Sequence, residues 1–309
     1  MTLAPPLVVI AGATATGKTD LAITLAERLI AVGRPAEIIS ADSRQVYRGL
    51  DIGTAKASAE ERARVPHHGL DLVDPDQPFS VADFVAHATD VLTNIHRMGG
   101  IAILAGGTGL YLRAVAGGLD TDALPSDAAV RARLEADLVS DGLPTMVARL
   151  TTLAPALAAT VDLKNARRVV RALEIAELQG DAPRPPTRGY GGPLIWLGLR
   201  ADPAAHTTRI RQRARGQFNG GLIEEAGALR ERFDPTLPAF SAIGYREAWA
   251  VLDDELSREA AVDLVTRRSS AFAKRQGTWF RAEPEITWLD FIGRDLVDVA
   301  WAAVRVLVG

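Results

Sequence analysis

The stretch from residue 12 to residue 19 constrains this chain most, because it fits the phosphate-binding pattern G-x-x-x-x-G-K-[ST] at every position. The apolar residues 7–10 before it are typical of a buried strand, and residues 20–29 after it have apolar side chains at helical spacing. The loop is therefore predicted to join a strand to a helix, with its N–H groups and the positive helix end directed at one oligophosphate. Its residues are Gly12, Ala13, Thr14, Ala15, Thr16, Gly17, Lys18 and Thr19.

Two side chains of this loop have expected roles. Lys18 is expected to reach the terminal phosphate oxygens, and Thr19 is expected to hold Mg²⁺ through its hydroxyl. The alternative is that the glycines only serve a turn, and the flanking strand and helix argue against it. The pattern indicates a class of ligand but not a reaction.

The composition excludes several classes of protein. With no cysteine, the chain has no disulfide, no thiolate zinc site and no cysteine nucleophile, and its net charge of -3 excludes a globally basic nucleic-acid binder. No apolar run approaches the roughly 20 residues that span a bilayer, and the N-terminus lacks the pattern of a signal peptide. A cytoplasmic protein that does not bind membranes is expected.

Further apolar runs predict the rest of a sheet. Strands are expected at residues 37–42, 69–74, 101–105, 194–199 and 286–290, and a helix is expected over residues 81–98, with Ser80 as its N-cap. Strands that alternate with helices indicate an α/β fold with a parallel sheet and helices on both faces.

The pattern of strands stops between about residues 119 and 192. Helix-forming residues dominate there, and the Pro- and Gly-rich residues 183–193 are predicted to be a linker. A mainly helical insertion at 119–192 is therefore expected, between the two parts 1–118 and 193–309 of the phosphate-binding core. Six arginines are spread over its helices: Arg131, Arg133, Arg149, Arg167, Arg168 and Arg171.

Two polar residues follow predicted strands, where ligands bind in open α/β sheets. Asp42 can hold Mg²⁺, act as a general base, or simply cap a turn, and its position alone does not choose among these roles. Thr108, in a glycine-rich turn, can contact a ligand or stabilise that turn. His67 and His68 are adjacent, so on a strand they point to opposite sides and are expected to have structural roles.

Positive charge is concentrated in two stretches. Residues 161–232 contain 13 Lys and Arg against 8 Asp and Glu, and residues 267–281 contain 5 against none. The second stretch also contains Phe272, Trp279 and Phe280, a composition suited to phosphate contacts and base stacking. A solvated helix face is the alternative explanation.

An ordered set of motifs over nearly the whole chain resembles the tRNA dimethylallyltransferases, which prenylate N6 of adenosine 37 next to the anticodon. The motifs are the phosphate loop, DSRQVYRGLDIGTAK at 42–56, the two histidines with Asp71, SVADF at 80–84, GGTGLYL at 106–112, NARRVVRALE at 165–174, GLIEE at 221–225, AIGYRE at 242–247 and AKRQGTWFR at 273–281. The loop is generic, but the ordered set is specific to this family.

The resemblance implies the reaction and its partners. The loop is expected to bind dimethylallyl diphosphate with Mg²⁺, the carbon–oxygen bond breaks, and diphosphate leaves. The catalytic residues implied are Asp42, as the base for the N6 amine, with Lys18, Thr108 and Arg131. The expected contacts with the anticodon stem-loop of the tRNA come from Asp42, Ser43, Arg44, Gln45, Thr108, Arg131, Arg167, Arg168, Val169, Val170, Arg171, Lys274 and Arg275. A monomeric protein is expected.

Three residues depart from the family pattern. Ala13 and Ala57 stand where proline is usual, and Phe272 stands where tyrosine is common. The C-terminal part contains no cysteine, so it has no zinc finger of the kind found in eukaryotic relatives. The absence of this zinc finger is typical of the bacterial type. Three other classes remain as alternatives: a P-loop kinase of small molecules, an adenylate isopentenyltransferase that acts on free nucleotide, and a non-catalytic RNA-binding module.

Overall fold

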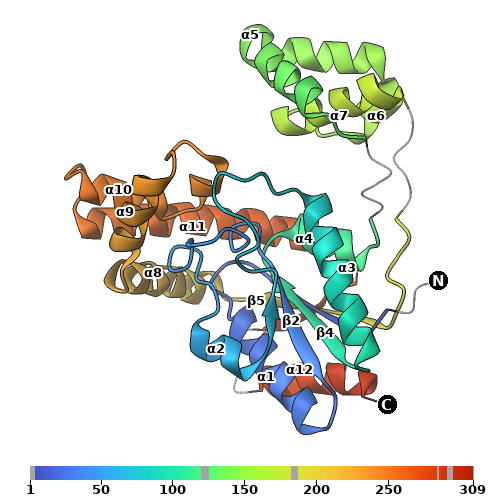
Figure 1. Ribbon diagram of the computed structural model, residues 1–309, viewed down its shortest axis with the longest axis vertical. Helices are drawn as coiled ribbons and strands as arrows, with labels where there is room; N and C mark the ends of the chain where they lie inside the picture. Colours follow the sequence, from blue (N-terminus) through green and yellow to red (C-terminus); the bar gives the residue numbers. More distant parts are fainter. Residues whose placement is uncertain (1–3, 120–124, 182–186, 284, 291–294, 309) are drawn as a thin grey trace. The chain divides into compact units, whose positions relative to one another are not determined.

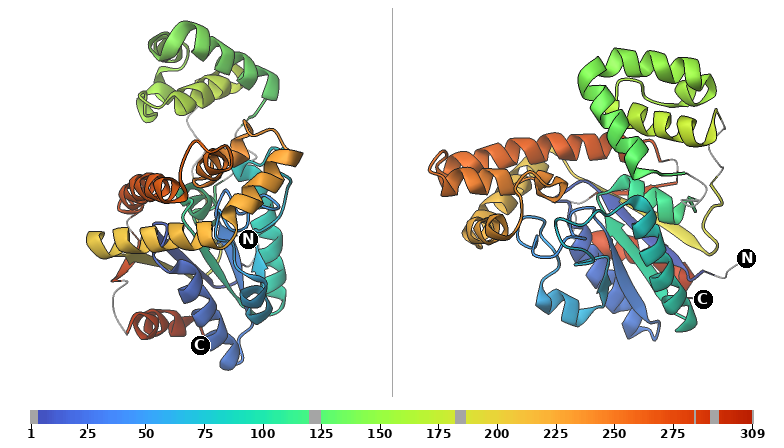
Figure 2. Two further views of the ribbon diagram at one scale, coloured as in Figure 1. Left: turned by 90° about the vertical axis from the view of Figure 1, so that its left-hand side faces the viewer. Right: turned by 45° about the horizontal axis from the view of Figure 1, so that its top comes forward.

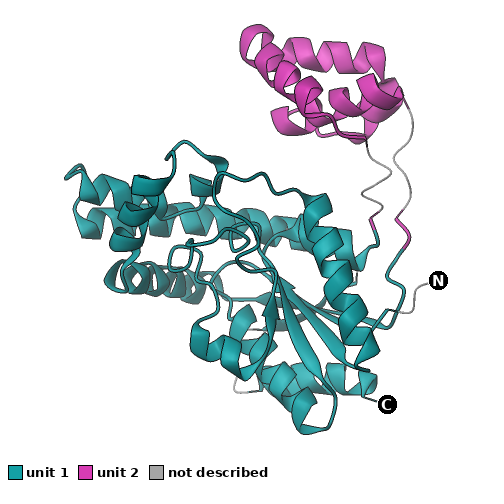
Figure 3. Cartoon of the chain, in the orientation of Figure 1, with its two compact units in different colours: residues 1–118, 189–309 teal, residues 119–188 magenta. Residues whose placement is uncertain are grey.

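The computed structural model describes residues 4–119, 125–181, 187–283, 285–290 and 295–308. The chain divides into two compact units (Figure 3): Met1–Gly118 with Gly189–Gly309, which we call the core unit, and Leu119–Arg188, the helical unit. The first boundary falls between Gly118 and Leu119. The second falls at Gly189 rather than at residue 193, and the Gly189 N–H donates a hydrogen bond to the Gly117 carbonyl of the core unit at 3.0 Å.

The core unit is built on one parallel sheet, which confirms the predicted fold class. In the described residues the sheet has six strands in the order β3-β2-β4-β1-β5-β6, and every neighbouring pair is parallel. The strands are β1 (Leu7–Gly12), β2 (Ala36–Ala41), β3 (His67–His68), β4 (Ile101–Gly106), β5 (Leu194–Arg200) and β6 (Thr287–Asp290).

Helices cover both faces of this sheet (Figures 1 and 2). Side chains alternate along β1, so that Val9 belongs to one apolar core and Val8 to the other. The core around Val8 includes residues of α1 (Lys18–Ala31) and α12 (Leu296–Val304). The core around Val9 includes residues of α3 (Val81–Arg97), α4 (Gly109–Ala116) and α11 (Arg258–Phe280). Ser80 caps α3 as predicted, by accepting a hydrogen bond from the Asp83 N–H.

The prediction of a strand at residues 69–74 is wrong. The third strand is only His67–His68, because two residues with positive φ follow it: Gly69 at +77° and Asp71 at 56°. A side chain at Gly69 would also lie 2.6 Å from the Ser40 carbonyl oxygen. His68 instead bonds Glu37 at 2.7 Å, which agrees with a structural role for the histidines.

The segment of residues 47–56 is anchored to helices that follow β5. The Glu225 carboxylate accepts hydrogen bonds from the N–H groups of Asp51, Ile52 and Gly53 at 3.1, 2.7 and 3.1 Å, and from the Tyr245 hydroxyl at 2.7 Å. Glu225 belongs to α9 (Leu222–Arg232) and Tyr245 to α10 (Tyr245–Leu252). The other helices of the core unit are α2 (Ala59–Arg64), α8 (Pro203–Asn219) and the short η1 (Pro238–Ser241) and η2 (Arg305–Leu307).

The described residues of the helical unit form three helices and no strand. They are α5 (Ala128–Leu153), α6 (Pro155–Thr160) and α7 (Ala166–Gln179), with a small apolar core between them. Gly142, at φ 78°, interrupts α5 and divides it into two helical segments. The predicted linker at 183–193 lies partly outside the described residues; residues 187–193 form neither helix nor strand.

The Glu225 anchor gives a test of the fold. Replacing Glu225 by alanine leaves three backbone N–H groups and one hydroxyl without their acceptor, so we expect a loss of about 3 kcal/mol in the free energy of unfolding. Urea denaturation measures it, with Glu224→Ala as the exposed neighbouring control, which should change stability by less than about 0.5 kcal/mol. Equal stabilities of the two variants would show that the anchor does not stabilise the fold.

Candidate active site

The phosphate loop runs from the end of β1 to the start of α1, as the sequence predicted. Gly17 has the left-handed conformation (φ 81°), which glycine adopts without strain, and α1 begins at Lys18. Inside the loop, the Thr16 hydroxyl and the Lys18 ammonium both donate to the Ala13 carbonyl oxygen at 2.8 Å. The Lys18 side chain is thus folded back over the loop.

Helices α8 and α11 hold the loop from outside. His206 of α8 bonds the Thr14 carbonyl oxygen through Nε2 at 2.7 Å, and Arg209 Nε donates to the Ala15 carbonyl oxygen at 3.2 Å. The Gln276 side chain of α11 accepts a hydrogen bond from the Thr14 N–H at 2.9 Å. These three side chains could not be assigned to the loop from the sequence, because they lie far along the chain from it.

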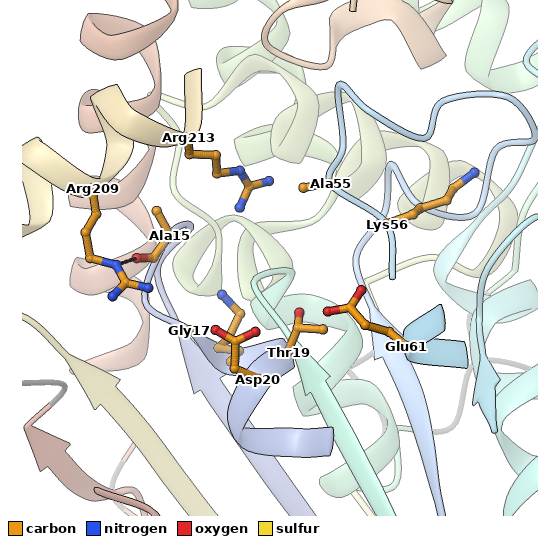
Figure 4. Close-up of a pocket in the computed structure, with 10 residues that line it drawn as sticks. Ala15, Gly17, Thr19, Asp20, Ala55, Lys56, Glu61, Arg209 and Arg213 are labelled. Atoms are coloured by element: carbon orange, nitrogen blue, oxygen red, sulfur yellow. Dashed lines mark hydrogen bonds between the residues drawn. The ribbon is translucent and has the colours of Figure 1, made fainter. Parts of the chain in front are cut away.

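A cavity of about 300 Å³ opens beside the loop (Figure 4). Arg209 and Arg213 extend into this region from α8, and Glu61 of α2 faces them across Thr19, whereas the Lys56 side chain points away. The Lys56 side chain is buried and donates hydrogen bonds to Asp51, Asp71 and the Tyr47 carbonyl. These bonds stabilise the wall of the cavity. The lining residues are Ala15, Gly17, Lys18, Thr19, Asp20, Ala55, Lys56, Glu61, Arg209 and Arg213.

The cavity concentrates positive charge. Burial, followed by the charge of Arg213, lowers the pKa of Lys18 to about 8, while the carboxylate of Asp42 acts in the opposite direction. Burial also lowers the pKa of Arg213, and Asp42 again opposes the shift. Burial disfavours the charged forms of Lys18 and Arg213. A bound anion would stabilise both charged forms, so the pair favours anion binding.

Asp42 lies at the carboxyl end of the parallel strands, where the phosphate loop also lies. It follows β2, and Thr108 follows the neighbouring β4. The Thr108 N–H donates to the Ala41 carbonyl at 3.1 Å, and its hydroxyl accepts a hydrogen bond from the Ser43 N–H at 3.0 Å, so Thr108 fixes the backbone on both sides of Asp42. Asp42 Oδ1 accepts a hydrogen bond from the Arg44 N–H at 2.8 Å.

The residues after Asp42 contact their own chain. Arg44 donates to the Pro238 carbonyl at 2.9 Å. Gln45 accepts from the Ser40 hydroxyl at 2.7 Å and donates to the Thr54 and Ala55 carbonyls, both at 3.1 Å. The side chain of Gln45 thus ties β2 to the cavity wall, and its expected contact with RNA stays a prediction.

The expected RNA-binding residues of the helical unit have different environments. Val169 and Val170 are buried in its core, so their side chains are not exposed to a partner. Arg131 and Arg171 pair with the Glu174 carboxylate at 2.9 and 2.7 Å, and that side chain is fully buried. These pairs stabilise the helical unit. Arg167 and Arg168 are exposed on α7. The catalytic role expected of Arg131 stays a prediction.

The C-terminal basic stretch forms most of the second half of α11. Lys274 and Arg275 are exposed, while Ala273 and Gln276 are buried against the core unit. Trp279 is covered by the Arg113 guanidinium at 4.4 Å from the ring centroid. One face of α11 therefore packs on the site, and the other presents its cations to solvent.

The surroundings of Thr19 fit Mg²⁺ that arrives with a diphosphate. In the described part of the chain, no three His, Cys, Asp or Glu side chains gather as a metal-binding group. Mg²⁺ needs few protein ligands when phosphate oxygens and water complete its octahedron, and Thr19 is exposed in the cavity.

Among the described helices, none is long and apolar enough to cross a membrane.

The lowered pKa of Lys18 predicts how anion binding depends on pH. Lys18 is charged below its pKa of about 8, so the affinity for inorganic pyrophosphate should fall by up to about tenfold per pH unit above it. Calorimetry between about pH 7 and about pH 10 measures this, with Lys18→Arg as the control that stays charged. Identical pH profiles for the two proteins would show that Lys18 does not contact the anion.

Comparison with known proteins identifies the family. The family model described as IPP transferase matches residues 45–283, and the one described as isopentenyl transferase matches residues 5–67. The tRNA dimethylallyltransferase of Anaeromyxobacter sp. (strain K) is 46% identical over 288 residues, which are 92% of this chain and 92% of that protein. That of Thermobifida fusca is 40% identical over 301 residues, which are 96% and 94% of the two chains.

A solved structure agrees with these matches over nearly the full length. The crystal structure of the full-length tRNA isopentenylpyrophosphate transferase from Bacillus halodurans has a TM-score of 0.70 and 39% sequence identity, and 98% of each chain is covered. The chain therefore belongs to the IPP transferase family.

Proposed function

We propose that this chain is a tRNA dimethylallyltransferase, which transfers the dimethylallyl group of dimethylallyl diphosphate to N6 of adenosine 37 next to the anticodon and releases diphosphate. One observation carries the proposal. Asp42 follows β2 and the phosphate loop follows β1, at the same end of the sheet, and the Asp42 carboxylate opposes the lowering of the pKa of Lys18 and of Arg213. An anion-binding end and a carboxylate end thus share one site, as transfer from a diphosphate to an amine requires.

The anion-binding end serves the leaving group. When the carbon–oxygen bond breaks, negative charge develops on the α-phosphate oxygen that was bonded to the allylic carbon. Arg213 and the loop border the cavity there, and the Lys18 ammonium reaches the diphosphate by exchanging the Ala13 carbonyl for a phosphate oxygen, so these groups can stabilise that charge. Thr19 would hold Mg²⁺, which would supply further positive charge at the leaving diphosphate.

The carboxylate end serves the nucleophile. The N6 amine is conjugated into the purine ring and is a poor nucleophile, so removal of its proton during attack helps the reaction. Asp42 is the candidate base, because it is partly exposed and Thr108 fixes the backbone around it. The proton goes from N6 to Asp42 as the bond from N6 to the allylic carbon forms.

The RNA partner follows from the reaction. An adenine inside a stacked loop cannot reach a cavity of this kind, so the target base must flip out of the stack. The exposed cations of α11, Lys274 and Arg275, are suited to the phosphates of an anticodon stem-loop, and Arg167 and Arg168 are suited to the same task in the helical unit. We further propose that the enzyme acts as a monomer in the cytoplasm.

Two other functions use the same phosphate loop. A P-loop kinase shares the loop and the cavity, but it does not need the basic, aromatic face of α11. An adenylate isopentenyltransferase prenylates free nucleotide, and it would not depend on an anticodon stem-loop. The length of the IPP transferase match, residues 45–283, favours the tRNA-modifying enzyme.

One assay separates these functions. The protein is incubated with dimethylallyl diphosphate, Mg²⁺ and a stem-loop in which adenosines flank adenosine 37, and the RNA is then weighed by mass spectrometry. We expect one added dimethylallyl group per RNA, and none on a matched stem-loop with inosine at position 37, which lacks the amine. Prenylation of free adenosine monophosphate but not of the RNA would refute the proposal.

The role of Asp42 is tested by Asp42→Asn, which keeps the size of the side chain but cannot take a proton near neutral pH. If Asp42 is the base, single-turnover prenylation should fall by roughly 10²–10⁴ with both substrates still bound. Asp20→Asn removes a charge from the same cavity and is the matched control. If added Mg²⁺ restores the rate, Asp42 is a metal ligand and not the base, because mass action offsets a weakened metal site.

The exposed face of α11 is tested by the double substitution Lys274→Ala with Arg275→Ala. Each cation on a phosphate releases counterions, so the variant should bind the stem-loop more weakly and with a shallower dependence on salt. Binding isotherms at several salt concentrations measure the slope, and Arg305→Ala, at an exposed position outside the site, is the control. Affinities equal to wild type at every salt concentration would assign Lys274 and Arg275 no part in RNA binding.

A further inference from the structure

Gln276 connects the two ends of the proposed site. Gln276 lies on the buried face of α11 and is only 8% exposed. Its Oε1 accepts a hydrogen bond from the Thr14 N–H of the phosphate loop at 2.9 Å, and its Nε2 donates to the Gly107 carbonyl oxygen at 2.8 Å. Both contacts need this orientation of the amide, because an N–H donor and a carbonyl acceptor cannot exchange partners.

The contact at Gly107 leads directly to the base. Gly107 immediately precedes Thr108, whose N–H and hydroxyl bond the backbone on either side of Asp42. A side chain at Gly107 would lie 2.4 Å from Gln276 Nε2, so the absence of a side chain there leaves room for the amide. One planar amide therefore spans the gap between the diphosphate end and the Asp42 end.

The packing of α11 keeps this amide in place. Ala273, one turn before Gln276, packs with Ala13 of the phosphate loop. Trp279, one turn after it, lies against Gly109, where a side chain would come within 2.3 Å of the indole ring. Gln276 is thus held at the centre of a contact between α11, the phosphate loop and the turn after β4.

We propose that Gln276 is a positioning residue, whose amide sets the spacing between the diphosphate held by the phosphate loop and the amine beside Asp42. The proposal rests on the proposed prenyl transfer. It requires no contact between Gln276 and either substrate. Because Gln276 acts on the relative position of the two ends, its loss should affect the chemical step more than the binding of either substrate alone.

The first test is Gln276→Met, which keeps the length of the side chain but loses both hydrogen bonds. At saturating substrates we expect single-turnover prenylation to fall on the order of 10²-fold, while the dissociation constants for pyrophosphate and for the stem-loop change less than about threefold. Gln212→Met, at an exposed position on α8, is the matched control and should leave the rate unchanged. A normal rate in Gln276→Met, or a loss found only in affinity, would overturn the proposal.

Gln276→Glu supplies a readout that a purely structural role would not move. When protonated, the carboxyl can accept from the Thr14 N–H and donate its O–H to the Gly107 carbonyl, as the amide does. When ionised, it places negative charge against that carbonyl. The ratio of the Gln276→Glu rate to the Gln276→Met rate should therefore rise as pH falls. Lys18, Asp42, His206 and Arg213 are present in both variants, so the ratio isolates the effect of the carboxyl group introduced at position 276 and its charge. A ratio independent of pH would contradict the proposal.

Gly107→Ala tests the same contact from the other side. The new methyl group should displace the Gln276 amide and lower the rate by a similar factor, but it should cost almost nothing when added to Gln276→Ala, which leaves room for it. Independent, multiplicative losses would refute the proposal. Failure of the wild-type protein to prenylate RNA would instead refute the proposed function, so the two failures are distinguishable.

Discussion

A loop that binds an oligophosphate through its N–H groups needs other partners for its carbonyl oxygens, and the rest of this structure supplies them. His206 and Arg209 of α8 donate to the carbonyls of Thr14 and Ala15, and Lys18 donates to that of Ala13. The helices that follow β5 therefore form part of the loop's structure as well as covering the sheet. The segment of residues 47–56, anchored by Glu225, completes the cavity on the other side.

The order of the strands brings the two ends of the site together. β2, β4 and β1 are neighbours in the sheet, so the segments after their carboxyl ends meet at one edge. Asp42 follows β2, Thr108 follows β4, and the phosphate loop follows β1. Gly12 and Thr108 are 96 positions apart in sequence, and the order of the strands brings them to the same end of the sheet. Gln276 then bridges the loop and the turn from a third direction.

Local pattern was enough to predict the phosphate loop, the parallel sheet and the strand-end positions of Asp42 and Thr108, because each depends on a short run of residues. The third strand was predicted at residues 69–74 instead of at 67–68. The left-handed conformations of Gly69 and Asp71, which end the strand, cannot be predicted from the hydropathy of the sequence. Gln276, His206 and Arg209 could not be assigned to the loop from sequence patterning, because they lie far along the chain from it; Gln276 contacts Thr14 across 262 residues. The arginines of the helical unit were expected at RNA, and the structure shows that Arg131 and Arg171 also neutralise the buried Glu174.

The most direct test of the account is a crystal structure of the enzyme with Mg²⁺, an anticodon stem-loop and a dimethylallyl thiodiphosphate analogue that reacts slowly. The account predicts that the diphosphate lies on the loop in contact with Lys18 and Arg213, and that Lys18 has exchanged the Ala13 carbonyl for a phosphate oxygen. N6 of adenosine 37 should lie between the allylic carbon and Asp42. A diphosphate bound away from the loop, or an adenine whose N6 does not face Asp42, would contradict it.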